Sequence, residues 1–313
     1  MKVLIIGGTG HTGSHLARDL TRAGHQVVSV SRGRTRPYAT GEFWQQVEQV
    51  TLDRQQAERD GALAALLDDA KPDAVVDIVC YEPASAEALF ACVSGKVQHV
   101  VHVGTAWIYG DPKVIPTPES YRGEPLNDYA RNKLAVQDYY LQRFAHDEFP
   151  VTMVNPTQIT GAGKGFITPE GDKNPDYIRR MRAGEELPLP AHGRRLVHHV
   201  HPADVARVIG LALANPSVSA GQVYNAASAR AITYRGLFHF LRDHFGAECT
   251  ARPMSLEDYQ AAFGPNDTVT QHMIQSTCVD IRKPADQLGY RPAYSARQAV
   301  IDSLDALTAA GKL

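Results

Sequence analysis

The stretch KVLIIGGTGHTG, residues 2–13, decides the fold of this 313-residue chain. It begins with an uninterrupted apolar run, which is typical of a β-strand buried on both faces of a sheet. Gly7, Gly10 and Gly13 follow, and a helical pattern comes directly after them. In such a strand–loop–helix unit, Gly7 is expected to permit a tight turn, Gly10 to admit a pyrophosphate, and Gly13 to allow close helix packing. The unit predicts a dinucleotide-binding loop, with a plain tight turn as the alternative.

Strand and helix patterns alternate through the rest of the first half. Strands are expected over residues 2–6, 26–30, 47–52, 74–79, 99–103 and 151–154, and helices over 14–23, 63–70, 85–93 and 129–144. Alternation of this kind predicts right-handed crossovers between parallel strands. The fold class is therefore α/β, with a doubly wound parallel sheet of the Rossmann type.

The second half is less regular, and residues 155–193 are rich in glycine, proline and charge. Further strands are expected over 197–200 and 222–224, and helices over 204–214, 235–245 and 296–308. We predict a dinucleotide-binding domain made of residues 1–155 plus about 197–227. A smaller, interleaved C-terminal substrate-binding lobe is expected to contain about 156–196 plus 228–313.

Composition and charge exclude several classes of protein. The net charge of −2 argues against a dedicated nucleic-acid binder, which usually carries a basic excess. The four cysteines are scattered without a C-x-x-C pair, which is typical of a reducing compartment. No apolar run approaches the roughly 18–20 residues of a membrane span, and the chain opens on a strand without a signal segment. We expect a cytoplasmic protein whose partner is a small molecule, not a nucleic acid or a membrane.

The residues after the second predicted strand bear on the choice of dinucleotide. NAD enzymes usually place an acid there to hold the ribose 2′-hydroxyl, whereas this chain continues with Ser31-Arg32-Gly33. Arg32 can bind a 2′-phosphate, which favours NADP over NAD as cofactor; a solvated loop arginine is the alternative. Asp53 follows the third predicted strand and is placed to meet the adenine amino group, or else is a turn residue.

Three residues predict a catalytic group. Tyr129 and Lys133 stand four residues apart in a predicted helix, so their side chains share one face. A lysine ammonium favours the phenolate and lowers the tyrosine pKa from its usual value near 10. Thr105 follows the fifth predicted strand, at the edge where ligands of open α/β sheets bind. Its hydroxyl can donate to a substrate oxygen, although threonine is also common as an ordinary strand residue.

In their order along the chain, these motifs resemble the extended short-chain dehydrogenase/reductase family of NAD-dependent epimerases and dehydratases. The shared motifs are GGTGHTG (7–13), Leu52-Asp53-Arg54, Thr105 with Ile108-Tyr109-Gly110, Tyr129 with Lys133, Asn155-Pro156-Thr157, HVHPADVA (199–206), VDI (279–281) and LGYRP (288–292). Within the family, the chain looks most like the branch that includes chloroplast stem-loop RNA-binding proteins. The resemblance implies hydride transfer at a carbinol or carbonyl carbon, with Thr105, Tyr129 and Lys133 as the catalytic triad.

The resemblance also implies the remaining site residues and an assembly. Cofactor contacts are expected from Gly7, Gly10, Thr12, Gly13, Arg32, Asp53, Arg54, Val79, Tyr129, Lys133 and Asn155. Substrate contacts are expected from Tyr81, Trp107 and Arg195. Arg195 falls near the position that binds the substrate diphosphate in sugar-nucleotide epimerases; a solvated basic pair with Arg194 is the alternative. A homodimer through the helices over 85–93 and 129–144 is a further expectation.

Departures from the family pattern narrow the chemistry. Ala106 and Trp107 stand where the 4,6-dehydratases carry an Asp-Glu pair, and dehydration needs a general acid and base there. Dehydration is therefore not expected, while epimerase and reductase both stay open on a small polar, sugar-like or sugar-nucleotide substrate. Trp107 offers a stacking face or packs against the lobe. The alternative from another class is a catalytically silent nucleotide-binding or RNA-binding protein on the same fold.

Four histidines in one region raise the question of a metal: His192, His198, His199 and His201. No Asp, Glu or Cys completes a ligand set at a familiar spacing, so we expect no metal and predict packed or solvated histidines.

Overall fold

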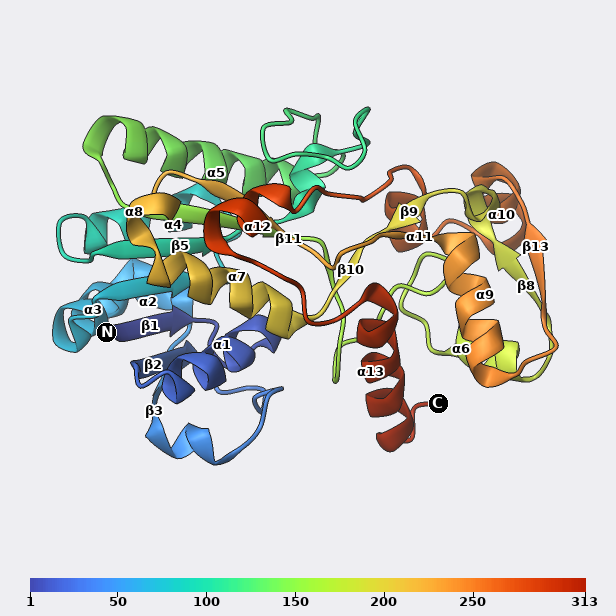
Figure 1. Ribbon diagram of the computed structural model, residues 1–313, viewed down its shortest axis with the longest axis horizontal. Coiled ribbons are helices and arrows are strands. Elements are labelled where there is room, and N and C mark those ends of the chain that lie inside the picture. Colours follow the sequence, from blue (N-terminus) through green and yellow to red (C-terminus); the bar gives the residue numbers. More distant parts are fainter.

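Seven parallel strands form the central sheet of the computed structural model, which describes residues 1–313 (Figure 1). Their order is β11-β6-β5-β4-β1-β2-β3, which reverses direction after β1 and confirms the doubly wound Rossmann sheet. The bounds are β1 (Lys2–Ile6), β2 (Gln26–Ser31), β3 (Val47–Thr51), β4 (Ala74–Asp77), β5 (His99–Val103), β6 (Val151–Pro156) and β11 (Val223–Ala226).

Helices cover both faces of this sheet. One face carries α1 (His11–Arg22) and α7 (Pro202–Ala214), and the other carries α3 (Ala62–Ala70), α4 (Pro83–Val93) and α5 (Asp128–Asp147). Alternate residues of a strand point to opposite faces. In β1, Val3 and Ile5 therefore pack against α1 and α7, while Leu4 and Ile6 pack against the opposite layer. This double burial explains why β1 is apolar at every position.

The lobe lies beside the sheet and has its own apolar core (Figure 1). It contains α6 (Asp176–Arg182), β8 (Glu186–Leu189), α9 (Tyr234–Phe245), β13 (Thr250–Pro253), α10 (Leu256–Phe263), α11 (Asp267–Met273) and α13 (Ala296–Ala309). β8 and β13 pair in parallel inside it. Two short strand pairs lie outside the central sheet. β7 (Gln158–Ile159) pairs with β10 (His199–Val200) and packs on the core of the sheet, whereas β9 (Leu196–Val197) pairs with β12 (Ile232–Thr233) and packs on the lobe core.

The observed elements differ from the sequence expectations at several places. The strand expected over 197–200 is divided into β9 and β10, which pair with different partners. Helix α12 (Arg282–Leu288), assigned with its surroundings to the lobe, packs instead against α7 and β11. The Tyr290 hydroxyl that follows it donates to the Ala227 carbonyl oxygen at 2.8 Å. The segment returns to the dinucleotide-binding domain because Leu288 and Tyr290 bury their side chains in that core.

The structure also contains α2 (Arg54–Asp60), α8 (Pro216–Ser219) and the 3₁₀ helix η1 (Glu42–Gln46), none of which was expected. None of the helices is both long enough and apolar enough to cross a membrane.

Candidate active site

The loop between β1 and α1 has the shape that a phosphate requires. Gly7 has a φ of 97°, in the left-handed region that favours glycine. A Cβ on Gly13 would lie 2.3 Å from the Gly7 carbonyl oxygen, so only glycine lets α1 approach the loop this closely. No side chain caps α1 at Gly10, and its first N–H groups remain available to an anion. The cradle fits the pyrophosphate of a dinucleotide.

This loop opens into a cleft of about 640 Å³ at the carboxyl ends of the strands. Twelve residues predicted from the sequence line it: Gly7, Gly10, Thr12, Arg32, Asp53, Arg54, Val79, Tyr81, Thr105, Trp107, Tyr129 and Lys133. Glycine loop, predicted triad and predicted aromatic residues therefore share one cavity. Gly13, Asn155 and Arg195 do not line it.

The predicted triad is assembled from two elements. Thr105 follows β5 and caps the short 3₁₀ helix η2 (Ala106–Tyr109), its hydroxyl oxygen accepting from the Trp107 N–H at 3.3 Å. Asn127 caps α5 by accepting from the Ala130 N–H at 2.9 Å, which sets the start of that helix. Tyr129 stands in its first turn and is 43% exposed at the cleft, whereas Lys133 one turn later is buried.

Burial dominates the electrostatics of the triad. The Lys133 ammonium donates to the Val103 carbonyl oxygen at 2.8 Å and lies 4.9 Å from the centroid of the Tyr81 ring. Burial lowers the pKa of Lys133 to about 8, although Cys80 and Asp77 act in the opposite direction. Burial also raises the pKa of Tyr129, contrary to the lowering expected from Lys133, and the nearby Thr105 hydroxyl opposes that rise. With a pKa of about 8, the Lys133 ammonium loses its proton closer to neutral pH than an ordinary lysine does.

Asn155, expected to contact the cofactor, is used inside the protein instead. Its Oδ1 accepts from the Thr105 N–H at 3.1 Å, and its Nδ2 donates to Gln137 at 2.8 Å. It is 1% exposed and outside the cleft. Asn155 therefore positions the backbone of Thr105, because its amide already bonds on both sides.

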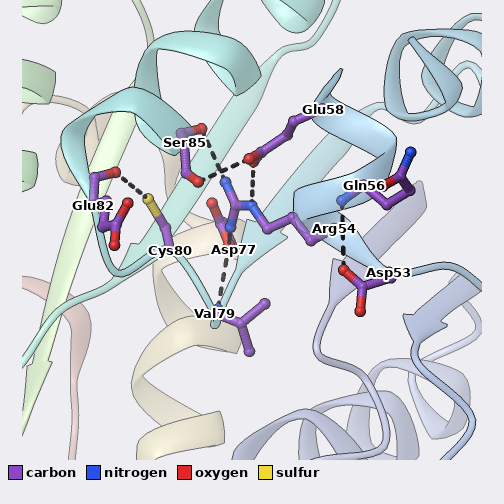
Figure 2. Close-up of polar contacts among 9 residues, drawn as sticks. All are labelled: Asp53, Arg54, Gln56, Glu58, Asp77, Val79, Cys80, Glu82 and Ser85. Carbon is purple, nitrogen blue, oxygen red and sulfur yellow. Dashed lines mark hydrogen bonds and ion pairs between the residues drawn. The ribbon is translucent and has the colours of Figure 1, made fainter. Parts of the chain in front are cut away.

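Arg54 lines the cleft but is held by a buried network, which Figure 2 shows. Its guanidinium pairs with Asp77 and with Glu58, each at 2.5 Å, and donates to the Ser85 carbonyl oxygen at 3.0 Å. The Asp77 side chain is fully buried, and that of Arg54 is 8% exposed. Arg54 therefore joins α2, β4 and α4 at the floor of the cleft. A cofactor contact by Arg54 stays a prediction.

Arg195 does not reach the cleft, contrary to the expected substrate contact. Its guanidinium pairs with Asp111 at 3.2 Å and donates to the Met273 carbonyl oxygen at 3.0 Å. These bonds tie the loop after η2 to the lobe. They engage Nε and Nη1 of the guanidinium within the protein.

Sequence reasoning missed two lysines of the cleft wall, Lys164 and Lys173. They lie in the glycine- and proline-rich segment after β7, where no strand or helix pattern signals which side chains face inward. Sequence reasoning also missed His272, whose ring packs edge-on against Trp107 with the ring centroids 5.2 Å apart.

The four histidines of the region form no common ligand set, and three of them bond to different groups. His198 and His199 bond to the Ser228 carbonyl and the Thr160 hydroxyl, each at 2.8 Å. His201 bonds to Asp302 at 3.0 Å. His192 lies in the turn η3 (Pro190–Gly193).

A different buried group places possible metal ligands together: Asp77, Cys80 and His102 have ligand atoms within 4.8 Å of one another. Arg54 forms an ion pair with the Asp77 carboxylate, and the Lys133 ammonium interacts electrostatically with Asp77 and Cys80. These two side chains supply the positive charge that a metal would otherwise bring, and they oppose a divalent cation at this point.

The fold and the cleft together define a dinucleotide-binding enzyme of the extended short-chain dehydrogenase/reductase type. Residues 3–227 match the model of the NAD dependent epimerase/dehydratase family, and the chain belongs to that family. This confirms the resemblance found in the sequence motifs.

Individual relatives agree with this membership. The chain is 27% identical over 249 residues to the 2′-dehydrokanamycin reductase of Streptomyces kanamyceticus, covering 79% of this chain and 67% of that protein. It is 23% identical over 246 residues to chloroplast stem-loop binding protein of 41 kDa b from Arabidopsis thaliana, covering 75% of this chain and 61% of that protein. The fold is similar to UDP-glucose 4-epimerase of Thermotoga maritima, solved with UDP-glucose, with a TM-score of 0.76, 20% identity and 99% of both chains covered.

Proposed function

We propose that this chain is an NADP-dependent reductase that transfers hydride to a carbonyl carbon of a small polar, sugar-like substrate. The observation that carries the proposal is that Thr105, Tyr129 and Lys133 line the same cleft as the glycine loop. The nicotinamide of a bound dinucleotide would supply the hydride. The protein's own residues would bind the substrate oxygen and provide the proton that balances the reaction.

We propose one role for each residue of the triad. The Thr105 hydroxyl stands at the sheet edge and orients the substrate oxygen. Tyr129 donates its hydroxyl proton to that oxygen and regains a proton from solvent, to which it is 43% exposed. The Lys133 ammonium donates to the Val103 carbonyl oxygen and stands one turn after Tyr129 in α5. We infer that its positive charge favours the phenolate left on Tyr129.

Aromatic side chains support a ring-shaped polar substrate. The Tyr129 ring has neighbours on two sides, with Tyr81 and Trp107 centroids at 6.3 and 6.4 Å. Aromatic faces bind the C–H side of a sugar ring while hydroxyl groups meet the polar atoms of a cleft.

The preference for NADP rests on the end of β2. Arg32 and Arg34 line the cleft there, and a neighbouring hollow of about 290 Å³ is lined by Ser31, Arg34 and Arg36. Guanidinium groups suit a 2′-phosphate, and no carboxylate follows β2 to hold a 2′-hydroxyl. NAD is the alternative. The mass and absorbance of the nucleotide released from purified protein would decide between them.

The test of the reductase is Tyr129→Phe measured against a panel of ketosugars and aminoglycoside ketones with NADPH. We expect wild-type turnover of at least one compound and a loss of at least about 100-fold in the variant, with unchanged NADPH affinity. An unchanged rate would refute the assigned chemistry.

An epimerase is a second candidate, favoured by the fold shared with a UDP-glucose 4-epimerase. It predicts that the cofactor copurifies, stays bound through turnover, and that no net NADPH is consumed. A silent RNA-binding protein predicts instead salt-dependent affinity for a stem-loop RNA and no turnover.

A homodimer and a cytoplasmic location stay proposals. The outward face of α4 carries Ala84, Ala88 and Ala91, a spacing that would let a second copy approach closely. Light scattering at working concentration tests the dimer. All four cysteines are free, as expected in a reducing compartment, and fractionation of cells expressing the protein tests the location.

A further inference from the structure

Two cationic side chains of the lobe, Lys164 and Lys173, face the cleft without an acidic partner. Both line the cavity, and neither forms an ion pair with a carboxylate. Burial lowers the pKa of Lys164, and the charge of Lys173 lowers it further. Because both positive charges face one cavity, an anion bound between them would be attracted by both.

The loop that joins the two lysines holds them side by side. Its apolar residues Phe166 and Ile167 are buried in the lobe core. The Thr168 hydroxyl and the Asn174 N–H both donate to the Asp172 carboxylate at 3.0 Å. The other acid of the loop, Glu170, accepts from the Tyr259 hydroxyl at 2.7 Å, so both carboxylates are bonded inside the lobe. A Cβ built on Gly165 would lie 3.8 Å from the Lys173 Cβ, so the two ends of the loop meet.

The start of this loop is fixed against the glycine loop. A Cβ on Gly163 would lie 2.7 Å from the Tyr38 ring, and that ring stacks on His11 with centroids 3.4 Å apart. From the other side, the Ser303 hydroxyl of α13 donates to the Lys164 carbonyl oxygen at 2.7 Å. The backbone of Lys164 is therefore held between the first turn of α1 and the C-terminal helix.

The glycine loop itself carries no formal positive charge. Burial lowers the pKa of His11 to about 3, and the nearby Lys164 adds to that shift, so this ring is neutral at pH 7. The other cationic residues that line the cleft are held at other points of its wall. Arg32 and Arg34 follow β2, Arg54 is paired with carboxylates, and Lys133 donates to the Val103 carbonyl oxygen. A pyrophosphate at the glycine loop would meet N–H dipoles on one side and the two lysines on the other.

We propose that Lys164 and Lys173 form an anion subsite for a pyrophosphate group on the lobe wall of the cleft. The proposal rests on the dinucleotide cleft of the proposed function. The pyrophosphate can belong to the cofactor or to a nucleoside-diphosphate substrate, since both carry the same group. If it is the cofactor's, the ligand bridges the two parts of the molecule, because its other contacts come from the α1 N-terminus.

The test compares Lys164→Met and Lys173→Met with Lys113→Met, which removes a lysine whose side chain is 81% exposed outside the cleft. Binding of NADPH, ADP-ribose and adenosine is measured by calorimetry, and binding of UDP is measured on NADPH-saturated protein. Adenosine lacks phosphate and reports on the integrity of the cleft. Circular dichroism and melting curves confirm that each variant is folded.

If the pyrophosphate is the cofactor's, Lys164→Met and Lys173→Met each weaken NADPH and ADP-ribose binding about tenfold, with adenosine unchanged. If it is the substrate's, they weaken UDP binding by a similar factor and leave ADP-ribose alone. Both results support the subsite, and Lys113→Met stays at the wild-type value. Binding of ADP-ribose and UDP within twofold of wild type in both variants would overturn it. Wild-type protein that binds neither NADPH nor NADH would refute the proposed function instead, and inorganic pyrophosphate would then test the two lysines directly.

Discussion

Removing the guanidinium at the floor of the cleft should destabilise the protein far more than removing an exposed one. Arg54→Met keeps most of the aliphatic volume but leaves the fully buried Asp77 carboxylate without its cation. It also deprives Glu58, whose side chain is only 13% exposed, of its partner. Loss of one member of a buried ion pair costs about 3–5 kcal/mol, and we expect the free energy of unfolding to fall by that amount.

The assay is urea unfolding at pH 7, followed by fluorescence and circular dichroism. Arg131→Met is the matched control, because Arg131 pairs with Asp128 at the surface, with the two side chains 54% and 92% exposed. Exposed pairs of this kind contribute about 0.2–1 kcal/mol.

A double-mutant cycle separates the ion pair from packing. Arg54→Met combined with Asp77→Asn removes both charges. The loss of unfolding free energy in the double variant should therefore be smaller than the sum of the two single losses, by about 2 kcal/mol or more. A cost below about 1 kcal/mol for Arg54→Met, or strict additivity in the cycle, would show that solvent reaches the pair and that the reasoning is wrong.

Three further predictions concern the cleft. Arg32→Ala should weaken NADPH binding about tenfold and leave NADH binding unchanged, as measured by fluorescence titration, since only NADPH carries the 2′-phosphate. Trp107→Ala should raise the substrate KM several-fold without changing the NADPH Kd; an altered Kd would place the ring against the cofactor. Because burial lowers the pKa of Lys133 from 10.5 to about 8, the unfolded chain binds more protons between these values. The free energy of unfolding should therefore rise with pH across that window, and Lys133→Met should reduce the rise relative to wild type.

Much of the sheet could be predicted because its signals are local. β1 and β5 have the bounds expected from their apolar runs, and the glycine loop lies between β1 and α1 as expected. Such strands are buried on both faces, so every position in them is apolar and the pattern is unambiguous. Helix α2 and the β8–β13 pair were missed, since elements this short are stabilised by their neighbours more than by their own sequence.

The amino-acid sequence by itself determined the fold class, the phosphate loop and the family, and it named Thr105, Tyr129 and Lys133. Each of these depends on local motifs and on their order along the chain, because the strand, glycine-loop and helix patterns are read from neighbouring residues. Only the tertiary structure decided the partners of the longer polar side chains. Asp111 holds Arg195 from 84 positions away, and Asp77 holds Arg54 from 23 positions away. A charged side chain can bond to any complementary group that folding brings within reach, so its role follows from the packed chain and not from its neighbours in sequence.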